Sequence, residues 1–106
     1  MAKYLIHGNY TVEGIRGVRS EGGTGRVEAV RALASSVGGS VESVYFAFGG
    51  DDYYVVVDLP DNVTAAAVAT AVAASGAVRV STTVLLTPEE MDAATKVDVS
   101  YRAPGG

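Results

Sequence analysis

Four segments of the chain alternate between apolar and polar residues or are rich in β-branched and aromatic side chains, which is typical of β-strands. The first is Lys3–Thr11 and the last is Ala77–Leu86. Between them, Val41–Phe48 and Tyr53–Leu59 flank the turn-forming sequence at 49–52. We therefore predict that the two middle strands form a β-hairpin.

Helical patterns fill the intervals before and after this hairpin. Apolar residues recur at helical spacing over 26–37, after a short helical turn at 12–19 and a glycine-rich stretch at 20–25. We interpret 20–25 as a flexible connector or lid. The segment 63–75 is almost entirely alanine and valine, which predicts a helix that can lie close on a sheet.

A third helix is predicted near the C-terminus. Thr87-Pro88-Glu89-Glu90 supplies an N-cap, a proline and a capping-box glutamate, so a short helix should run to about Lys96. The order β-α-β-β-α-β specifies an α+β, ferredoxin-like fold with a four-stranded antiparallel sheet and an added C-terminal helix. We assign residues 1–96 to this domain and 97–106 to a C-terminal tail or arm.

The strands divide their side chains between two faces of the sheet, because successive residues point in opposite directions. We expect the helices to pack on the more apolar face. That face holds Tyr4, Ile6, Gly8, Tyr10, Val44, Phe46, Phe48, Tyr53, Val55, Val57, Leu59, Val78, Val80, Thr82 and Val84. The other face holds Leu5, His7, Asn9, Ser43, Tyr45, Ala47, Tyr54, Val56, Asp58, Arg79, Ser81, Thr83 and Leu85.

This second, mixed face is too apolar to be an ordinary wet surface. Its apolar residues would form a patch beyond the few hundred Å² that monomers usually tolerate. A chain of 106 residues also buries a smaller share of its surface than a large domain, so pairing adds stability. We therefore expect a homodimer or higher oligomer, sheet facing sheet, around a space lined by aromatic and polar groups.

Composition and charge narrow the possible chemistry. The chain has no cysteine, which excludes disulfides, thiolate nucleophiles and cysteine-ligated metal. It shows no signal peptide and no apolar run of membrane-spanning length, so we expect a cytoplasmic protein. The net charge is −4, and the basic residues Arg16, Arg19 and Arg26 alternate with glutamates, which argues against nucleic-acid or membrane partners.

Several sequence blocks, in order along nearly the whole chain, form a specific combination. They are Lys3-Tyr4-Leu5-Ile6, Tyr10-Thr11-x-Glu13-Gly14, Glu21-Gly22-Gly23-Thr24-x-Arg26, Tyr45-Phe46-Ala47-Phe48-Gly49, Asp58-Leu59-Pro60-Asp61-Asn62, Ser75-Gly76-Ala77-Val78-Arg79-Val80 and Leu86-Thr87-Pro88-Glu89-Glu90. Together they resemble the GYD domain family. The resemblance implies a small bacterial protein of the dimeric α/β-barrel type. That superfamily includes cofactor-independent monooxygenases, dehydratases, haem-degrading enzymes and ligand-sensing domains.

One turn departs from the family's pattern. The family is named for a Gly-Tyr-Asp turn after the second strand, whereas this chain has Gly49-Gly50-Asp51-Asp52. Asp52 fits the aspartate, and Asp51 stands where the tyrosine would be. The resemblance implies no particular reaction.

His7 is the only histidine and lies mid-strand on the mixed face. An imidazole has a reference pKa of about 6.5 and can act as an acid or base near neutral pH; alternatively, His7 is an interface residue hydrogen-bonded beside Asn9. Tyr45, Tyr54 and Asp58 are candidates to orient a planar ligand or share a proton with His7, although tyrosines more commonly fill cores and interfaces. One histidine without cysteine makes no convincing haem or zinc site, so we expect no cofactor and no metal.

Two further features have ordinary explanations. The stretch from Gly22 to Arg26 precedes a helix, whose first amide groups can hold an anion, but it matches neither a P-loop nor a dinucleotide-binding fingerprint. The aspartates at 51, 52, 58 and 61 lack calcium-loop spacing, and capping of the hairpin explains the first two.

Three hypotheses about function remain open. In the first, a homodimer binds a small apolar or aromatic molecule on the mixed face, lined by His7, Asn9, Tyr45, Tyr54 and Asp58. In the second, His7 is the acid/base of a cofactor-independent oxygenase, cyclase or isomerase at the same place. In the third, the dimer is purely structural or partner-binding, and its interior is filled by its own side chains.

Overall fold

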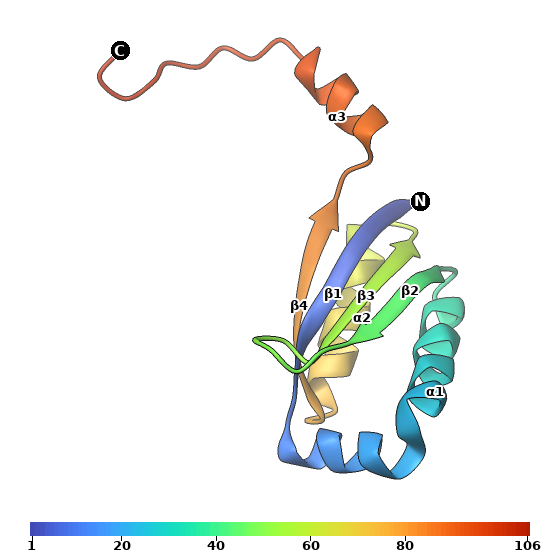
Figure 1. Cartoon of the computed structure of the whole chain (residues 1–106). Coiled ribbons are helices and arrows are strands. Elements are labelled where there is room, and N and C mark those ends of the chain that lie inside the picture. The colour runs from blue at the N-terminus through green and yellow to red at the C-terminus, as the bar shows by residue number, and fades with distance from the viewer.

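The computed structural model describes residues 1–106 as four strands and three helices (Figure 1). They are β1 (Ala2–Tyr10), α1 (Val12–Ser36), β2 (Ser40–Phe46), β3 (Tyr53–Leu59), α2 (Asn62–Ala74), β4 (Val78–Leu85) and α3 (Pro88–Thr95). The predicted order is confirmed. Each strand, α2 and α3 begins and ends within two residues of the range expected from the sequence.

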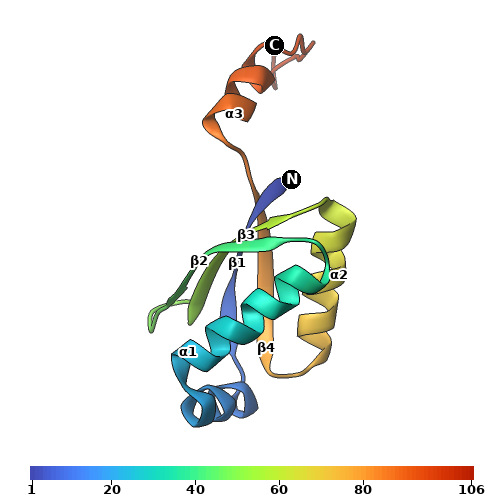
Figure 2. The same ribbon diagram turned by 90° about the vertical axis from the view of Figure 1, so that its right-hand side faces the viewer.

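The strands form one antiparallel sheet in the order β2-β3-β1-β4, the arrangement of a ferredoxin-like fold. Helices α1 and α2 lie on the same side of this sheet (Figure 2). We call the opposite side the open face. The register confirms the predicted division of side chains, since Tyr45, Tyr54, His7 and Ser81 stand opposite one another in a row across the four strands.

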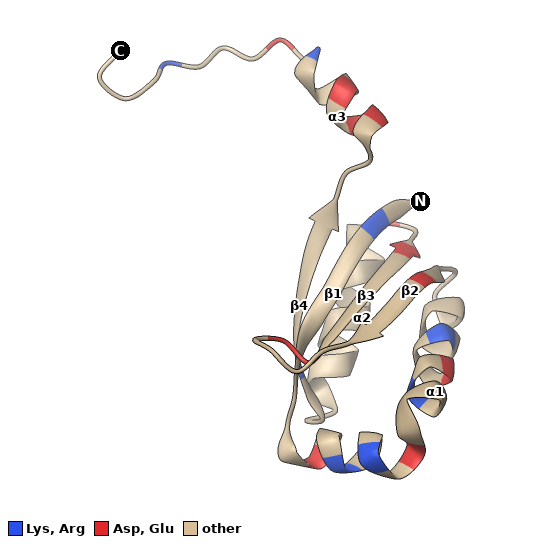
Figure 3. Cartoon of the chain, viewed as in Figure 1, with Lys and Arg blue, Asp and Glu red and all other residues tan.

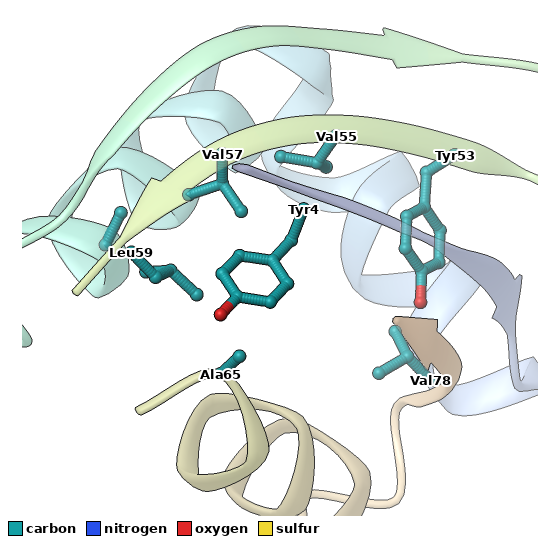
Figure 4. Packing of buried hydrophobic residues seen from close by; sticks show 8 residues of the cluster. Tyr4, Tyr53, Val55, Val57, Leu59, Ala65 and Val78 are labelled. Carbon is teal, nitrogen blue, oxygen red and sulfur yellow. The ribbon is translucent and has the colours of Figure 1, made fainter. Parts of the chain in front are cut away.

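The hydrophobic core lies between the sheet and the helices. Tyr4 and Leu59 are its largest fully buried side chains, and they point toward Ala65 of α2 (Figure 4). Every second residue of β3 is buried, from Tyr53 to Leu59. The side chains that we assigned to the helix-covered face therefore supply most of the core.

One residue assigned to that face does not lie under the helices. Phe48 is fully exposed because β2 ends at Phe46 and the chain leaves the sheet there. Val84 is 54% exposed near the end of β4, but it lines a groove together with Ala65 and Ala69 of α2. The expectation of packing under the helices is therefore wrong for Phe48.

The glycine-rich stretch at 20–25 is not a loop, contrary to our interpretation. α1 continues through it and is interrupted only at Gly22, whose φ of 80° and ψ of 168° lie outside the helical range. This is a backbone conformation that glycine adopts more readily than any other residue. The result is a sharp bend between two helical halves, 12–21 and 23–36, which is visible in both ribbon views (Figures 1 and 2).

Side-chain caps define where the other two helices begin. Asp61 precedes α2 and accepts a hydrogen bond from the Thr64 amide, and this bond holds the pKa of Asp61 below its usual value. The predicted capping box of α3 is present, with Thr87 and Glu90 bonded reciprocally. None of the three helices combines the length and apolarity needed to cross a membrane.

The C-terminal segment from 88 to 106, which we call the arm, projects away from the sheet (Figure 1). All of its residues are exposed. The radius of gyration is 16.8 Å, whereas a compact chain of this length has about 13 Å. The arm thus contributes nothing to the core of its own chain.

Candidate functional site

His7 lies near the middle of β1 on the open face, between β3 and β4. Its Nδ1 is 2.8 Å from Oδ2 of Asp51, and its Nε2 is 3.3 Å from Oγ1 of Thr83. About a quarter of each of the His7 and Asp51 side chains is exposed. The only histidine is therefore held on both ring nitrogens and still remains accessible from solvent.

The Asp51 carboxylate determines which ring nitrogen of the neutral imidazole carries the hydrogen. An ionised carboxylate only accepts hydrogen bonds, so Nδ1 must carry the proton and donate to Asp51. Nε2 then has a free lone pair and faces the Thr83 hydroxyl, which can donate to it. The arrangement makes Nε2 the basic nitrogen of the ring and turns it toward Thr83 of β4 on the open face.

Asp51 reaches His7 because the loop between β2 and β3 folds back across β1 (Figure 1). Asp52 attaches this loop twice: its amide donates to Gly8 O at 2.7 Å, and its carboxylate accepts from the Tyr10 amide at 2.9 Å. Asn9 adds a third bond, since its side-chain amide, oriented to satisfy its neighbours, donates to Gly50 O at 2.9 Å. These bonds to β1 position the Asp51 carboxylate beside His7, on the side of the sheet opposite to the core.

Two tyrosines extend the site along the same row of the sheet. The rings of Tyr54 and His7 are nearly parallel, with an interplanar angle of 11° and centroids 6.1 Å apart. Tyr45 stands opposite Tyr54 on the neighbouring strand and is 69% exposed. Flat aromatic surface and one polar group therefore lie side by side, which suits a planar ligand.

Asp58 lies on the open face but does not contact His7. It pairs with Lys3, whose Nζ is 3.0 Å from the Asp58 carboxylate and 2.8 Å from that of Glu42. Hydrogen bonds to Glu42 and then Asp58 raise the pKa of Lys3. Lys3 stands four residues from His7 along β1, a separation of about 13 Å. The hypothesis that Asp58 shares a proton with His7 does not fit this geometry.

The carboxylate that does meet His7 is one that the sequence reasoning assigned to hairpin capping. That assignment is wrong for both carboxylates, since Asp51 meets His7 and Asp52 accepts a hydrogen bond from the Tyr10 amide of β1. Thr83 was placed on the correct face, but its contact with His7 was not foreseen. Asp51 is also the position at which the turn departs from the Gly-Tyr-Asp pattern. This departure is the one feature of the sequence that marks Asp51 as different from a hairpin residue of the family.

Four cavities of the chain lie on the helix-covered side of the sheet, and none of them is lined by His7, Tyr45 or Tyr54. In the single chain, these three side chains are all partly or largely exposed. No three histidine, aspartate or glutamate side chains come together as potential metal ligands.

The fold and this surface define a small ferredoxin-like α+β domain with an uncovered sheet face. Residues 4–95 match the GYD domain, so the chain belongs to the GYD domain family. No curated protein and no solved structure matches it.

Proposed function

We propose that the protein is a homodimer, joined through the open faces of two sheets, that binds a small apolar or aromatic molecule between them beside His7. The observation that carries this proposal is the uncovered row of Tyr45, Tyr54 and His7. A second sheet placed over this row would turn an accessible surface into a pocket.

The exposure of apolar side chains supports pairing. Tyr45 is 69% exposed and Tyr54 is 38% exposed, and Phe48 in the loop beside them is fully exposed. The next row of the open face adds Leu5 and Val56, which stand opposite each other. Soluble monomers rarely present contiguous apolar surface of this kind, and burying it is favourable by roughly 25 cal/mol per Å².

The arm supports the same conclusion independently. It carries exposed apolar side chains with no surface of their own chain to cover them, namely Met91, Val97, Val99 and Tyr101. It leaves the sheet at the end of β4, next to the start of β1 (Figure 1). A second copy packed on the open face would lie within reach of it, so we infer that the arm packs on the partner.

The chemistry of the row indicates the class of ligand. Tyrosine rings supply flat apolar area at low entropic cost, and His7 and Thr83 supply one hydrogen-bonding anchor. A planar or largely apolar molecule with a single polar group matches these features. Asn9 and Asp58, which we expected in the lining, are engaged with Gly50 and Lys3 and border the pocket at most.

A second candidate function, acid/base catalysis at the same place, is favoured by the contact between Asp51 and His7. A carboxylate on Nδ1 orients the ring and stabilises the imidazolium that forms when Nε2 takes a proton. His7 would then accept a proton from the bound molecule and return it at another atom, as in a cofactor-free isomerisation or cyclisation. In an oxygenase, His7 would take the proton and dioxygen would be the oxidant that reacts with the deprotonated molecule. Asp51 would act as a positioning residue.

Native mass spectrometry of protein purified gently from its own host tests the first proposal. We expect a dimer carrying one or two copies of a small molecule. The Tyr45→Ala variant should lose this molecule, whereas Val63→Ala, which changes an exposed residue of α2, should keep it. A dimer that never carries a ligand would favour the third hypothesis, a purely structural or partner-binding dimer. A monomer would contradict the pairing of two chains.

Catalysis is tested on the same ligand once its mass is known. His7→Gln should abolish its conversion and spare its binding. If His7→Gln converts the molecule as fast as the unchanged chain, His7 is not the acid/base.

A further inference from the structure

The bend in α1 opens a cleft on the side of the sheet opposite to His7. Its volume is about 480 Å³, within the range of roughly 300–1,000 Å³ that is usual for small-molecule sites. The two halves of α1, the end of α2 and the start of β4 form its walls. The lining includes Glu13 and Glu21 from the first half of α1 and Arg26 from the second.

A smaller cavity of about 60 Å³ lies deeper, between the sheet and the helices. Of its 13 lining residues, 12 are hydrophobic and the exception is Arg26. Five residues line both spaces: Tyr10, Arg26, Leu33, Val72 and Val78. The cleft and the cavity are therefore neighbours, with Arg26 at the junction.

Arg26 forms only a long ion pair at this junction. Its nearest carboxylate oxygen, Oε1 of Glu21, is 3.9 Å from Nη1, which is too far for a hydrogen bond. Only a third of its side chain is exposed. Burial raises the pKa of the neighbouring Tyr10, and the charge of Arg26 together with a hydrogen bond from Arg26 opposes part of this rise.

We propose that this space binds a small carboxylic acid with an aromatic or branched aliphatic body. The carboxylate would accept hydrogen bonds from Arg26, whose planar guanidinium matches a carboxylate with two parallel bonds. The apolar body would enter the inner cavity between Val30, Val68 and Val80. At about 60 Å³ this cavity holds roughly four to six water-sized atoms, so the body must be small.

The placement of charges selects this class of ligand over its alternatives. An amine would bind beside Glu13 and Glu21, which line the outer cleft only, and would leave the apolar cavity unfilled. A phosphate with two negative charges would meet the same two glutamates at close range. A single carboxylate carries one negative charge, so at Arg26 it meets less repulsion from Glu21 than a phosphate does, and its apolar body can still fill the inner cavity.

Phenylacetate is a suitable probe, with phenylacetamide as its uncharged counterpart. In a ¹H–¹⁵N NMR titration of the full chain, phenylacetate should shift the amide signals of α1, α2 and β4 around the cleft. We expect phenylacetamide to bind at least about tenfold more weakly, since it lacks the charge-assisted hydrogen bonds to Arg26. Equal binding of the two, or no saturable shift up to about 10 mM phenylacetate, would overturn the proposal.

Variants then locate the site. Arg26→Gln should weaken phenylacetate binding at least about tenfold, whereas Arg31→Gln, a change on the same half of α1 outside the cleft, should not. Val72→Phe should block the junction, and its dispersed amide spectrum would show that the chain still folds. Unchanged binding in either Arg26→Gln or Val72→Phe would contradict the proposed site.

This inference does not depend on the dimer or on the open face. His7→Gln and Tyr45→Ala should leave phenylacetate binding unchanged. Shifts confined to the open face and sensitive to these two variants would refute the Arg26 site while favouring the site beside His7.

Discussion

The pair formed by His7 and Asp51 should stabilise the folded chain measurably, and a double-mutant cycle isolates its contribution. Asp51→Ala and His7→Ala each remove one partner, and the double variant removes both. If the two side chains interact, the single changes are not additive, because either one alone already breaks the contact.

The structure sets the size of this coupling. A hydrogen bond to a charged group contributes roughly 1.5–3 kcal/mol when well shielded, whereas exposed ion pairs contribute at most about 1 kcal/mol. The bond from Nδ1 to Oδ2 is 2.8 Å, and about a quarter of each side chain is exposed. We therefore expect a coupling free energy of about 1 kcal/mol.

Urea unfolding of the four chains, at one pH and one protein concentration, measures this coupling. The concentration must be held constant because the stability of a dimer depends on it. Glu28, an exposed carboxylate on α1, provides the control: Glu28→Ala should be additive with His7→Ala. A coupling between Asp51 and His7 within about 0.3 kcal/mol of zero would refute the interaction on which the catalytic proposal depends.

Two further predictions concern the fold that holds the site. Tyr53 donates to Arg79 O at 2.9 Å, so Tyr53→Phe should cost about 1 kcal/mol at neutral pH. Because burial raises the pKa of Tyr53 to about 12, the unfolded chain loses this proton first as the pH rises above about 10. Stability should therefore fall between pH 10 and 12, less steeply in Tyr53→Phe, as urea unfolding across that range will show. Gly14→Ala should destabilise the chain by about 2 kcal/mol or more, because its methyl group would collide with the backbone carbonyl of Ala77. Gly17→Ala, on the same helix with open space around it, should stabilise by about 0.5–1 kcal/mol, and thermal unfolding separates the two outcomes.

The strands and their two faces were predictable because alternation has a fixed period and strongly β-forming residues mark each strand. Once Tyr45, Tyr54 and His7 fell on one face, the order of strands brought them into one row. Capping residues fixed the starts of α2 and α3 in the same direct way. Local patterns were sufficient for all of these features.

Features that depend on how distant segments meet were not predictable. Glycines at 22, 23 and 25 indicated a loop, yet α1 continues on both sides of a single bend at Gly22. The contact between His7 and Asp51 exists because the hairpin loop folds back over β1. No local sequence pattern predicts in which direction such a loop folds. The cleft at Arg26 depends on the bend in α1, so the sequence did not predict it either.

Static light scattering at micromolar concentration tests the central claim, that open faces pair, most directly. We predict twice the chain mass of 10.8 kDa for the unchanged protein and a single chain for Leu5→Lys, which places a charge in the middle of the open face. Val63→Lys, on the exposed surface of α2, should remain a dimer. A monomeric unchanged chain, or a Leu5→Lys variant that still dimerises, would contradict pairing through the open face.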